Sequence, residues 1–232
     1  TSATTICAGT SVTFTATPTN GGTTPSYQWK VNGNNVGTNN ALFTTTSLQN
    51  GDIVTVVMTS NASPCLTGSP ATSNAITMTV NPLALASITA TNGPSQCYGN
   101  DVTFTVSGTT NAIVYYNLNG GGTQFTVLTG GSAIITVPGA LTSQTLNLVS
   151  VDNGQCPVTL TETATVTIAT TTWDGTAWSN GMPDASKAVF ITGNLTLSSD
   201  ITACSIAISN NAVVTVSSGT NVTLQNAIQV AS

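Results

Sequence analysis

The chain has 232 residues, of which only 4% are charged: two Lys, seven acids and no His, for a formal net charge of −5. Two isolated Lys cannot form a basic patch, which excludes nucleic-acid binding. The missing His removes the commonest general base and a common zinc ligand, so we expect neither an enzyme nor a metal or other cofactor. No apolar run approaches the roughly 20 residues of a membrane span. The chain begins without Met or a signal peptide, so we expect a mature or excised chain.

An internal repeat organises most of the chain. Residues 7–15 (CAGTSVTFT) return as residues 97–105 (CYGNDVTFT), an offset of 90. A second Cys follows late in each copy, 58 or 59 residues after the first. The repeat predicts two diverged modules at 1–82 and 83–170, joined where a Pro ends a strand and stiffens the link.

Each copy has the pattern of short β-strands. Val12 and Phe14 alternate with Thr13 and Thr15, the period of a strand with one buried face. Runs at the end of each copy alternate in the same way, and β-branched residues dominate. Asn-Gly turns separate these runs at short intervals. The pattern predicts two small antiparallel β-sandwiches with helix content near zero.

The cysteines support an exported protein. Four of them sit at matched places in the two copies, which predicts one disulfide per module, Cys7–Cys65 and Cys97–Cys156. Each bond would close a loop of about 60 residues and stabilise by about 3–4 kcal/mol. Reduced, buried thiols are the alternative. Disulfides imply an oxidising, extracellular location. Cys204 is the odd cysteine, and we expect a buried free thiol because no base is present to activate it.

A Trp in the first copy marks a central strand. Trp29 lies in the segment YQWKVNG just before a turn, and Tyr116 occupies the matching place in the second copy. We expect both rings in the core between the two sheets. Stacking against a ligand is the alternative for these rings.

The pattern changes in residues 171–232. A turn-rich segment, WDGTAWSNGMPD, carries Trp173 and Trp178. Beyond it, apolar pairs that begin at Ile206, Val214 and Val222 recur every eight residues. A strand-plus-turn unit this short must stack on its neighbours to bury its apolar face. A parallel β-solenoid is predicted, with an antiparallel meander of hairpins as the alternative. The pattern stops without a polar cap, so we expect more sequence or another chain to cover it.

These motifs resemble a known group of modules. The C-x-G-x-x-V-T-F-T start, the Y-x-W-x-x-N-G strand and the late Cys resemble the Ig-like or PKD-like modules of large secreted adhesins in type IX-secreting Bacteroidota. The W-D-G-T-A-W-S-N-G-x-P segment resembles a module that often follows them. The resemblance implies export, a cell-surface or filament location, and an adhesive or spacer role.

An enzymatic alternative rests on two acids. Glycoside hydrolysis needs two carboxylates that face one cleft, and Asp174 and Asp184 flank the Trp-rich segment. Both also stand where an Asp stabilises a turn, in Asp-Gly and Pro-Asp pairs, which is our preferred interpretation. No Ser-x-x-Lys motif and no acid cluster with calcium-loop spacing is present.

Two classes of function follow. We expect a non-catalytic extracellular structural or adhesive protein, whose modules extend a surface protein or self-associate into a filament by strand addition. The alternative is a carbohydrate-binding module that stacks surface glycans on Trp173 and Trp178. We favour a structural role for this Trp pair, sealing the start of the solenoid.

Overall fold

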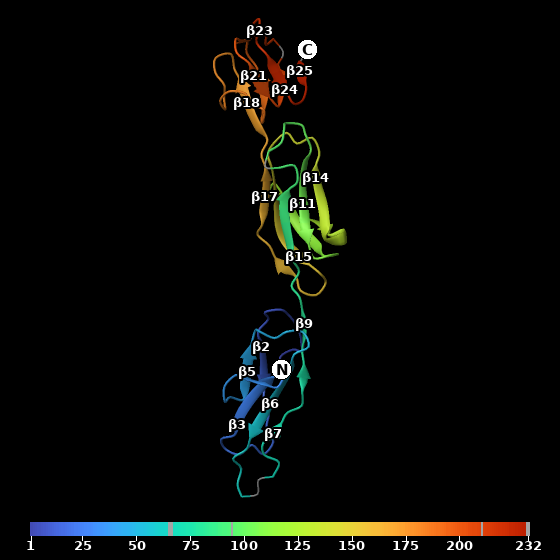
Figure 1. The fold of residues 1–232 in the computed structure, drawn as a ribbon, viewed down its shortest axis with the longest axis vertical. Helices are drawn as coiled ribbons and strands as arrows, with labels where there is room; N and C mark the ends of the chain where they lie inside the picture. Colours follow the sequence, from blue (N-terminus) through green and yellow to red (C-terminus); the bar gives the residue numbers. More distant parts are fainter. Residues whose placement is uncertain (65–66, 94, 210, 231–232) are drawn as a thin grey trace. The chain divides into compact units, whose positions relative to one another are not determined.

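The structure is a computed structural model that describes all residues except 65–66, 94, 210 and 231–232. The fold is all-β, as predicted (Figure 1). In the described part of the chain the one helical element is the 3-10 turn η1 (Thr129–Gly131). The residues form two compact units, one of Thr1–Leu83 with Gly154–Pro157 and one of Ala84–Asn153 with Val158–Ser232. The division at 82/83 and 170/171 stays a prediction.

The first unit is an immunoglobulin-like sandwich. One sheet has the order β4-β3-β6-β7, with β8 also on β6; it faces the antiparallel pair β2-β5, and β1 pairs with β9 in parallel. This is the B-E and C′-C-F-G pattern of Ig-like domains. Its strands are β1 Thr5–Cys7, β2 Val12–Thr15, β3 Ser26–Val31, β4 Asn34–Val36, β5 Leu42–Thr45, β6 Ile53–Thr59, β7 Ala71–Thr72, β8 Ile76–Thr77 and β9 Thr79–Asn81.

The predicted alternation builds the core of this sandwich. Val12 and Phe14 of β2 are each 1% exposed, while Thr13 between them is half-buried and Thr15 is exposed. Trp29 is 3% exposed on β3, as expected of a core residue, and its ring lies 5.7 Å from that of Phe43 and 6.1 Å from that of Phe14. Asn32 and Gly33 both have positive φ, which closes the β3–β4 hairpin in the way that an Asn-Gly pair favours.

The second unit begins with a fuller copy of the same sandwich. Its sheets have the orders β10-β11-β14 and β13-β12-β15-β16, with β17 also on β15. Tyr116 on β12 is buried, as predicted. The strands are β10 Ala86–Ala90, β11 Val102–Gly108, β12 Ile113–Leu118, β13 Gln124–Val127, β14 Ser132–Val137, β15 Gln144–Asp152, β16 Val158–Thr159 and β17 Thr163–Val166.

The rest of the second unit is a parallel β-solenoid of about three turns. Strands stack in parallel in the orders β18-β19-β22-β25, β20-β23 and β21-β24, which excludes a hairpin meander among the described residues. The strands are β18 Ala169–Trp173, β19 Lys187–Ile191, β20 Leu195–Leu197, β21 Ile201–Ala203, β22 Ser205–Ile208, β23 Val214–Val216, β24 Val222–Leu224 and β25 Ile228–Val230.

Apolar residues eight apart in the sequence lie on successive faces of one turn of the solenoid. Ile206, Val214 and Val222 lie on β22, β23 and β24, which follow one another around the solenoid. Stacked partners lie 17 to 22 residues apart, as in Leu195 beneath Val214 and Ile206 beneath Ile228. Neighbouring turns therefore bury apolar side chains such as Ile191, Leu195 and Ile206 against one another, as the short-repeat pattern requires, while Ile228 and Val230 of the last described strand are exposed.

Candidate functional site

The disulfide pairing differs from the prediction. Cys7 bonds Cys156, 149 residues away, and Cys97 bonds Cys204, 107 residues away, each pair with its Cα atoms 5.6 Å apart. Both predicted pairs, Cys7–Cys65 and Cys97–Cys156, are therefore wrong, and Cys65 itself lies outside the described residues. Cys204 is buried as expected but is not a free thiol.

Strand direction explains the error. Ser95, just before Cys97, pairs in parallel with Thr167, whereas β15 runs antiparallel to β17. Cys97 therefore lies at the end of the sandwich where β17 finishes, and β15 finishes at the opposite end. A seven-to-nine-residue strand spans about 25 Å, while a disulfide needs Cα atoms within about 7 Å. Matched spacing in the sequence says nothing about which end of a sandwich each cysteine reaches.

The Cys97–Cys204 bond joins the second sandwich to the solenoid within one unit. Two further contacts accompany it: the rings of Tyr98 and Phe190 meet edge to face at 5.2 Å, and the Asn226 amide donates to Asn100 Oδ1 at 3.0 Å. Phe190 lies on β19, Cys204 just before β22 and Asn226 just before β25, so these contacts reach three successive levels of the solenoid. Together they hold these levels against the sandwich.

Trp173 and Trp178 lie together at the start of the solenoid. Their ring centroids are 5.2 Å apart with planes tilted by 54°, and the two residues form an antiparallel bridge. The indole N–H of Trp173 donates to the carbonyl of Asn194 at 2.9 Å. Both half-buried rings pack against the apolar interior of the solenoid. The two rings therefore pack against the core of the solenoid where it begins, beside β18.

Asp174 and Asp184 each stabilise a turn. Asp174 Oδ1 accepts the backbone N–H groups of Thr176 and Ala177 at 2.7 and 2.9 Å, and these bonds, with that of the Thr176 hydroxyl, lower its pKa to about 2. Asp184 accepts the hydroxyl and N–H of Ser186 and pairs with Lys187 at 2.9 Å, which lowers its pKa also to about 2. A general acid needs a raised pKa, so both carboxylates have the wrong shift for that role.

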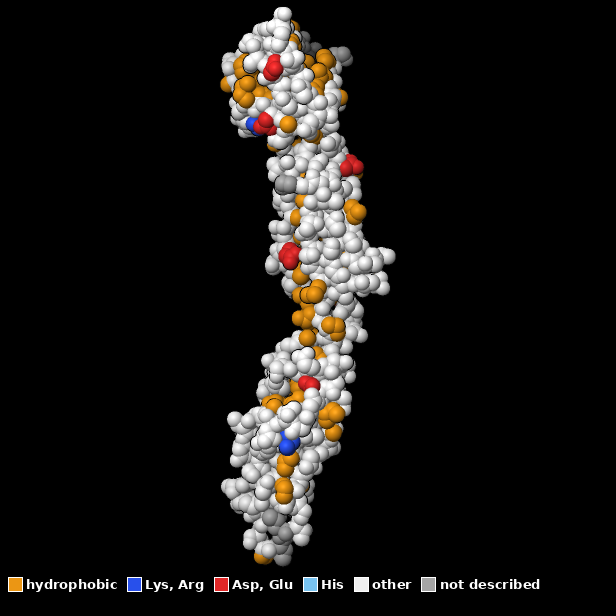
Figure 2. Space-filling model, viewed as in Figure 1, with side chains coloured by type: hydrophobic (Ala, Val, Ile, Leu, Met, Phe, Trp, Pro, Cys, Tyr) orange, Lys and Arg blue, Asp and Glu red, His pale blue; other side chains and the backbone are white. Residues whose placement is uncertain are grey.

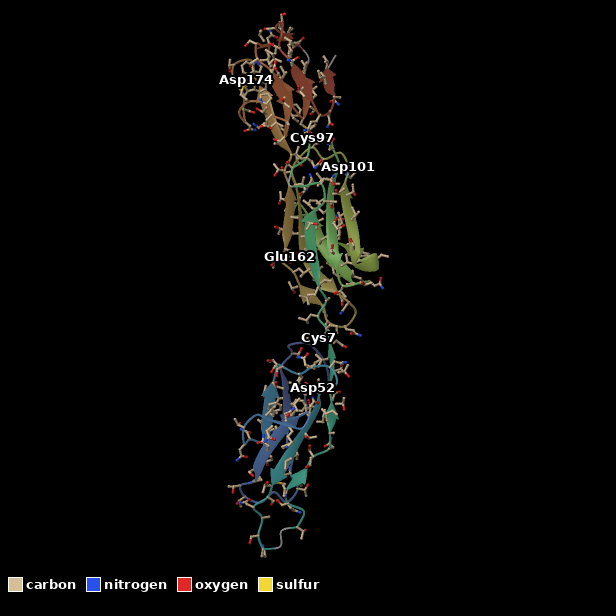
Figure 3. All side chains as sticks on the ribbon, in the orientation of Figure 1. Cys7, Asp52, Cys97, Asp101, Glu162 and Asp174 are labelled. Atoms are coloured by element: carbon tan, nitrogen blue, oxygen red, sulfur yellow. A yellow bond between two sulfur atoms is a disulfide. The ribbon has the colours of Figure 1, made fainter. Side chains whose placement is uncertain are left out.

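Other acids have similar structural uses. Backbone N–H groups donate to the carboxylates of Asp52, Asp101 and Asp200. Figure 3 shows Asp101, Glu162 and Asp174 on separate parts of the second unit. The described residues contain no group of three or more His, Cys, Asp or Glu that could hold a metal ion. On the face drawn in Figure 2, charged side chains form small, separate spots among uncharged ones.

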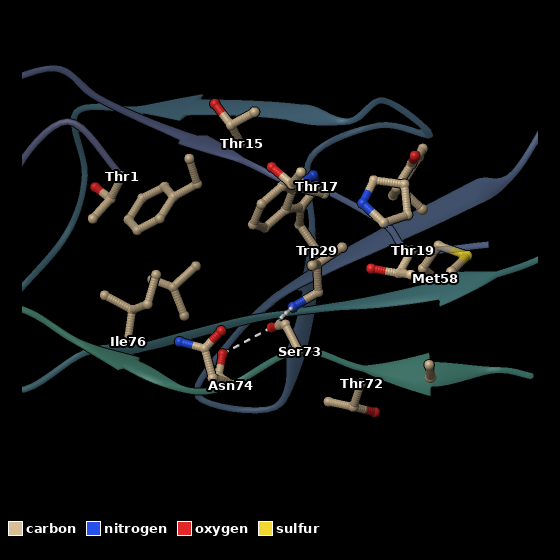
Figure 4. A pocket seen from close by; sticks show the side chains of 17 residues that line it. Thr1, Thr15, Thr17, Thr19, Trp29, Met58, Thr72, Ser73, Asn74 and Ile76 are labelled. Atoms are coloured by element: carbon tan, nitrogen blue, oxygen red, sulfur yellow. Dashed lines mark hydrogen bonds between the residues drawn. The ribbon is translucent and has the colours of Figure 1, made fainter. Parts of the chain in front are cut away.

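A groove in the first sandwich is the feature that sequence reasoning missed. It has a volume of about 530 Å³ and lies between β2, with the segment after it, and the strands β6 to β8. Figure 4 shows Thr15 and Thr17 on one wall, with Ser73, Asn74 and Ile76 on the other. The buried rings of Phe14 and Trp29 and the side chains of Val54 and Val56 line its inner part. None of its 17 described lining residues is Lys, Asp or Glu.

The chain matches no protein-family model, and no curated protein matches it significantly. Among solved structures it is similar to the human OSCAR ligand-binding domain, at 16% identity and a TM-score of 0.31, over 69% of this chain and 92% of that one. It is also similar to the N-terminal eight Ig domains of Down Syndrome Cell Adhesion Molecule, at 13% identity and a TM-score of 0.43, over 72% of this chain and 23% of that one. The Ig-like assignment rests on the strand pairing above.

None of the helical structure in the described residues is long and apolar enough to traverse a bilayer.

Proposed function

We propose that the chain is a non-catalytic structural or adhesive module of an extracellular protein. The observation that carries the proposal is the pair of long-range disulfides, Cys7–Cys156 and Cys97–Cys204. Such bonds persist in oxidising compartments and are rare in the cytosol. An Ig-like fold with two disulfides fits this class of protein. A location at the cell surface follows from the same argument.

The use of the acids supports a non-catalytic role. Five Asp carboxylates in the described part of the chain accept backbone N–H groups and so hold turns and loops: Asp52, Asp101, Asp174, Asp184 and Asp200. A chain with no His and few Lys has little equipment for proton transfer. That the protein belongs to a type IX-secreted adhesin of the Bacteroidota stays a prediction that rests on motif resemblance.

Mapping the disulfides tests the compartment. The protein is isolated from its native source under acid quench, free thiols are alkylated, and peptides are sequenced without reduction. The proposal expects Cys7 linked to Cys156 and Cys97 linked to Cys204 in nearly all molecules. Finding these four cysteines as free thiols would remove its main support.

A second candidate is carbohydrate binding by Trp173 and Trp178. The half-buried ring pair at the start of the solenoid favours it. Against it, sugar faces stack best on a freely presented ring, and here the rings tilt toward each other and pack on the core. A structural role for the pair is therefore our preferred interpretation.

Binding and stability measurements on one variant separate the two roles. Trp178→Ala is compared with Trp178→Phe, which keeps an aromatic ring at the same place. A structural role predicts that Trp178→Ala lowers the unfolding midpoint of the solenoid and that no glycan on an array binds the wild-type protein. Specific glycan binding that is lost in Trp178→Ala, with the unfolding midpoint unchanged, would establish the carbohydrate role instead.

A further inference from the structure

The two disulfides interleave along the chain. Cys97 lies between the partners of the first bond, Cys7 and Cys156, and Cys156 lies between the partners of the second bond, Cys97 and Cys204. Three segments therefore join one bond to the other, over 90, 59 and 48 residues: 7–97, 97–156 and 156–204. One bond within each copy would instead have left the two copies linked only in series.

All three segments cross the second sandwich. The first segment contributes β10, the second β11 to β15, and the third β16 and β17. Because β10 pairs with β11 and β17 pairs with β15, backbone hydrogen bonds hold the segments to one another. Cys97 and Cys156 are buried and lie at opposite ends of this sandwich. Each disulfide therefore fastens one end of it.

Little slack separates the two bonds. Cys7 pairs with Asn81 where β1 lies beside β9. From Asn81 the chain reaches Cys97 in 16 residues, which extend to at most about 60 Å. The segment 156–204 by itself would extend to about 170 Å. It reaches that length only if the first sandwich also opens, because both segments end at the same two bonds.

We propose that this protein bears tension and that its two disulfides share a pull among the three segments. A pull applied before Cys7 and after Cys204 enters one end of the second sandwich through the first bond and leaves the other end through the second bond. The strand pairs β10–β11 and β15–β17 then carry the load side by side, so no segment unravels alone. The inference rests on the proposed structural role, to which it adds the capacity to hold a load.

The second bond also acts as a stop. Residues after Cys204 form β22 to β25 and lie outside the loops that the disulfides close, so they bear the pull in series. Unravelling that begins there must pass Cys204 to reach β21, and the bond to Cys97 blocks it. Loss of structure from this end therefore stops after 28 residues, or about 100 Å of extended chain.

Single-molecule stretching of the oxidised full chain, held by its two ends, tests the stop. We expect a first gain in length of about 100 Å and then no further gain until the force rises. Cys97→Ala with Cys204→Ala removes the stop, so the first gain should grow to about 270 Å, the extended length of residues 156–232. Thr202→Ala is the matched control, because this exposed neighbour of Cys204 leaves both bonds in place and the trace should match that of the wild type.

A second variant tests the sharing of load. Cys7→Ala with Cys156→Ala places the first sandwich in series with the pull. The fully extended length should rise from about 300 Å in the wild type to about 450 Å, and lengthening beyond the first 100 Å should need less force than in the wild type. Native tryptophan emission checks that each variant folds, and the stop in the wild type is a test that needs no variant.

The proposal is overturned if the wild type lengthens past about 100 Å without a rise in force, or if both double variants need the same force as the wild type. Peptide mapping of the same oxidised preparation shows in either case that both bonds are present. Failure of load sharing is thus distinguishable from failure of the proposed extracellular structural role, which free thiols in the native protein would indicate.

Discussion

Removing the Cys97–Cys204 bond tests the corrected pairing and its energetic weight. The change is the double substitution Cys97→Ala with Cys204→Ala, which leaves no new free thiol. The bond spans 107 residues, and closing a loop of that length in the unfolded chain costs about 16 cal/mol/K of entropy, or about 5 kcal/mol at 25 °C. We expect the second unit to lose stability of about this size, or about 10–20 °C in its melting temperature.

The assay uses the tryptophans as local reporters. In a Trp29→Phe background, fluorescence comes only from Trp173 and Trp178, at the start of the solenoid. Denaturant unfolding of the oxidised protein is compared with that of the double variant. Thr202→Ala is the matched control, since this exposed residue on β21 lies two positions before Cys204 and should change stability by at most about 0.5 kcal/mol.

Single substitutions give the result that would refute the reasoning. With the observed pairing, Cys97→Ala, Cys204→Ala and the double variant all break the same bond, so their costs should be nearly equal rather than additive. If Cys204→Ala left the transition unchanged, and peptide mapping found Cys97 bonded to Cys156, the pairing in the structure would be wrong.

Three further substitutions have defined outcomes. Phe14→Ala should cost the first sandwich about 3–5 kcal/mol, measured from Trp29 fluorescence on unfolding, because Phe14 is 1% exposed. Gly108→Ala should destabilise by about 1–3 kcal/mol, since its Cβ would meet the Leu85 backbone, whereas Gly122→Ala, with nothing within 4 Å, should not. Asp174 has a pKa lowered from 3.8 to about 2, so its charge stabilises the fold above pH 4. The stability advantage of wild type over Asp174→Asn in a pH series should fade between pH 4 and 2, and an advantage that grew on acidification would contradict the assignment.

Local patterns in the sequence predict much of this protein correctly. Alternation at Val12 and Phe14 depends only on the two-residue period of a strand, which any neighbouring segment must respect. The position of Trp29 before an Asn-Gly turn predicts a buried central strand for a similar reason. The eight-residue spacing predicts a solenoid because so short a unit buries nothing by itself.

Contacts between segments that are far apart in the sequence could be identified only from the tertiary structure. Cysteine spacing differs by one residue between the two copies, yet the bonds follow strand direction, which places the ends of β15 and β17 at opposite ends of a sandwich. The Asp174 carboxylate has a sequence context that suits either a turn or an active site, and only its hydrogen bonds decide for the turn.

The groove in the first sandwich shows most clearly what the sequence determines and what only the tertiary structure decides. The amino-acid sequence by itself determines that β2 is a strand with one apolar face, because that follows from residues adjacent in the chain. Whether a further strand covers its edge depends on which segment reaches it in space. Only the folded structure could reveal that β10 pairs with β11 and that Phe14 and Trp29 line a groove in the first sandwich.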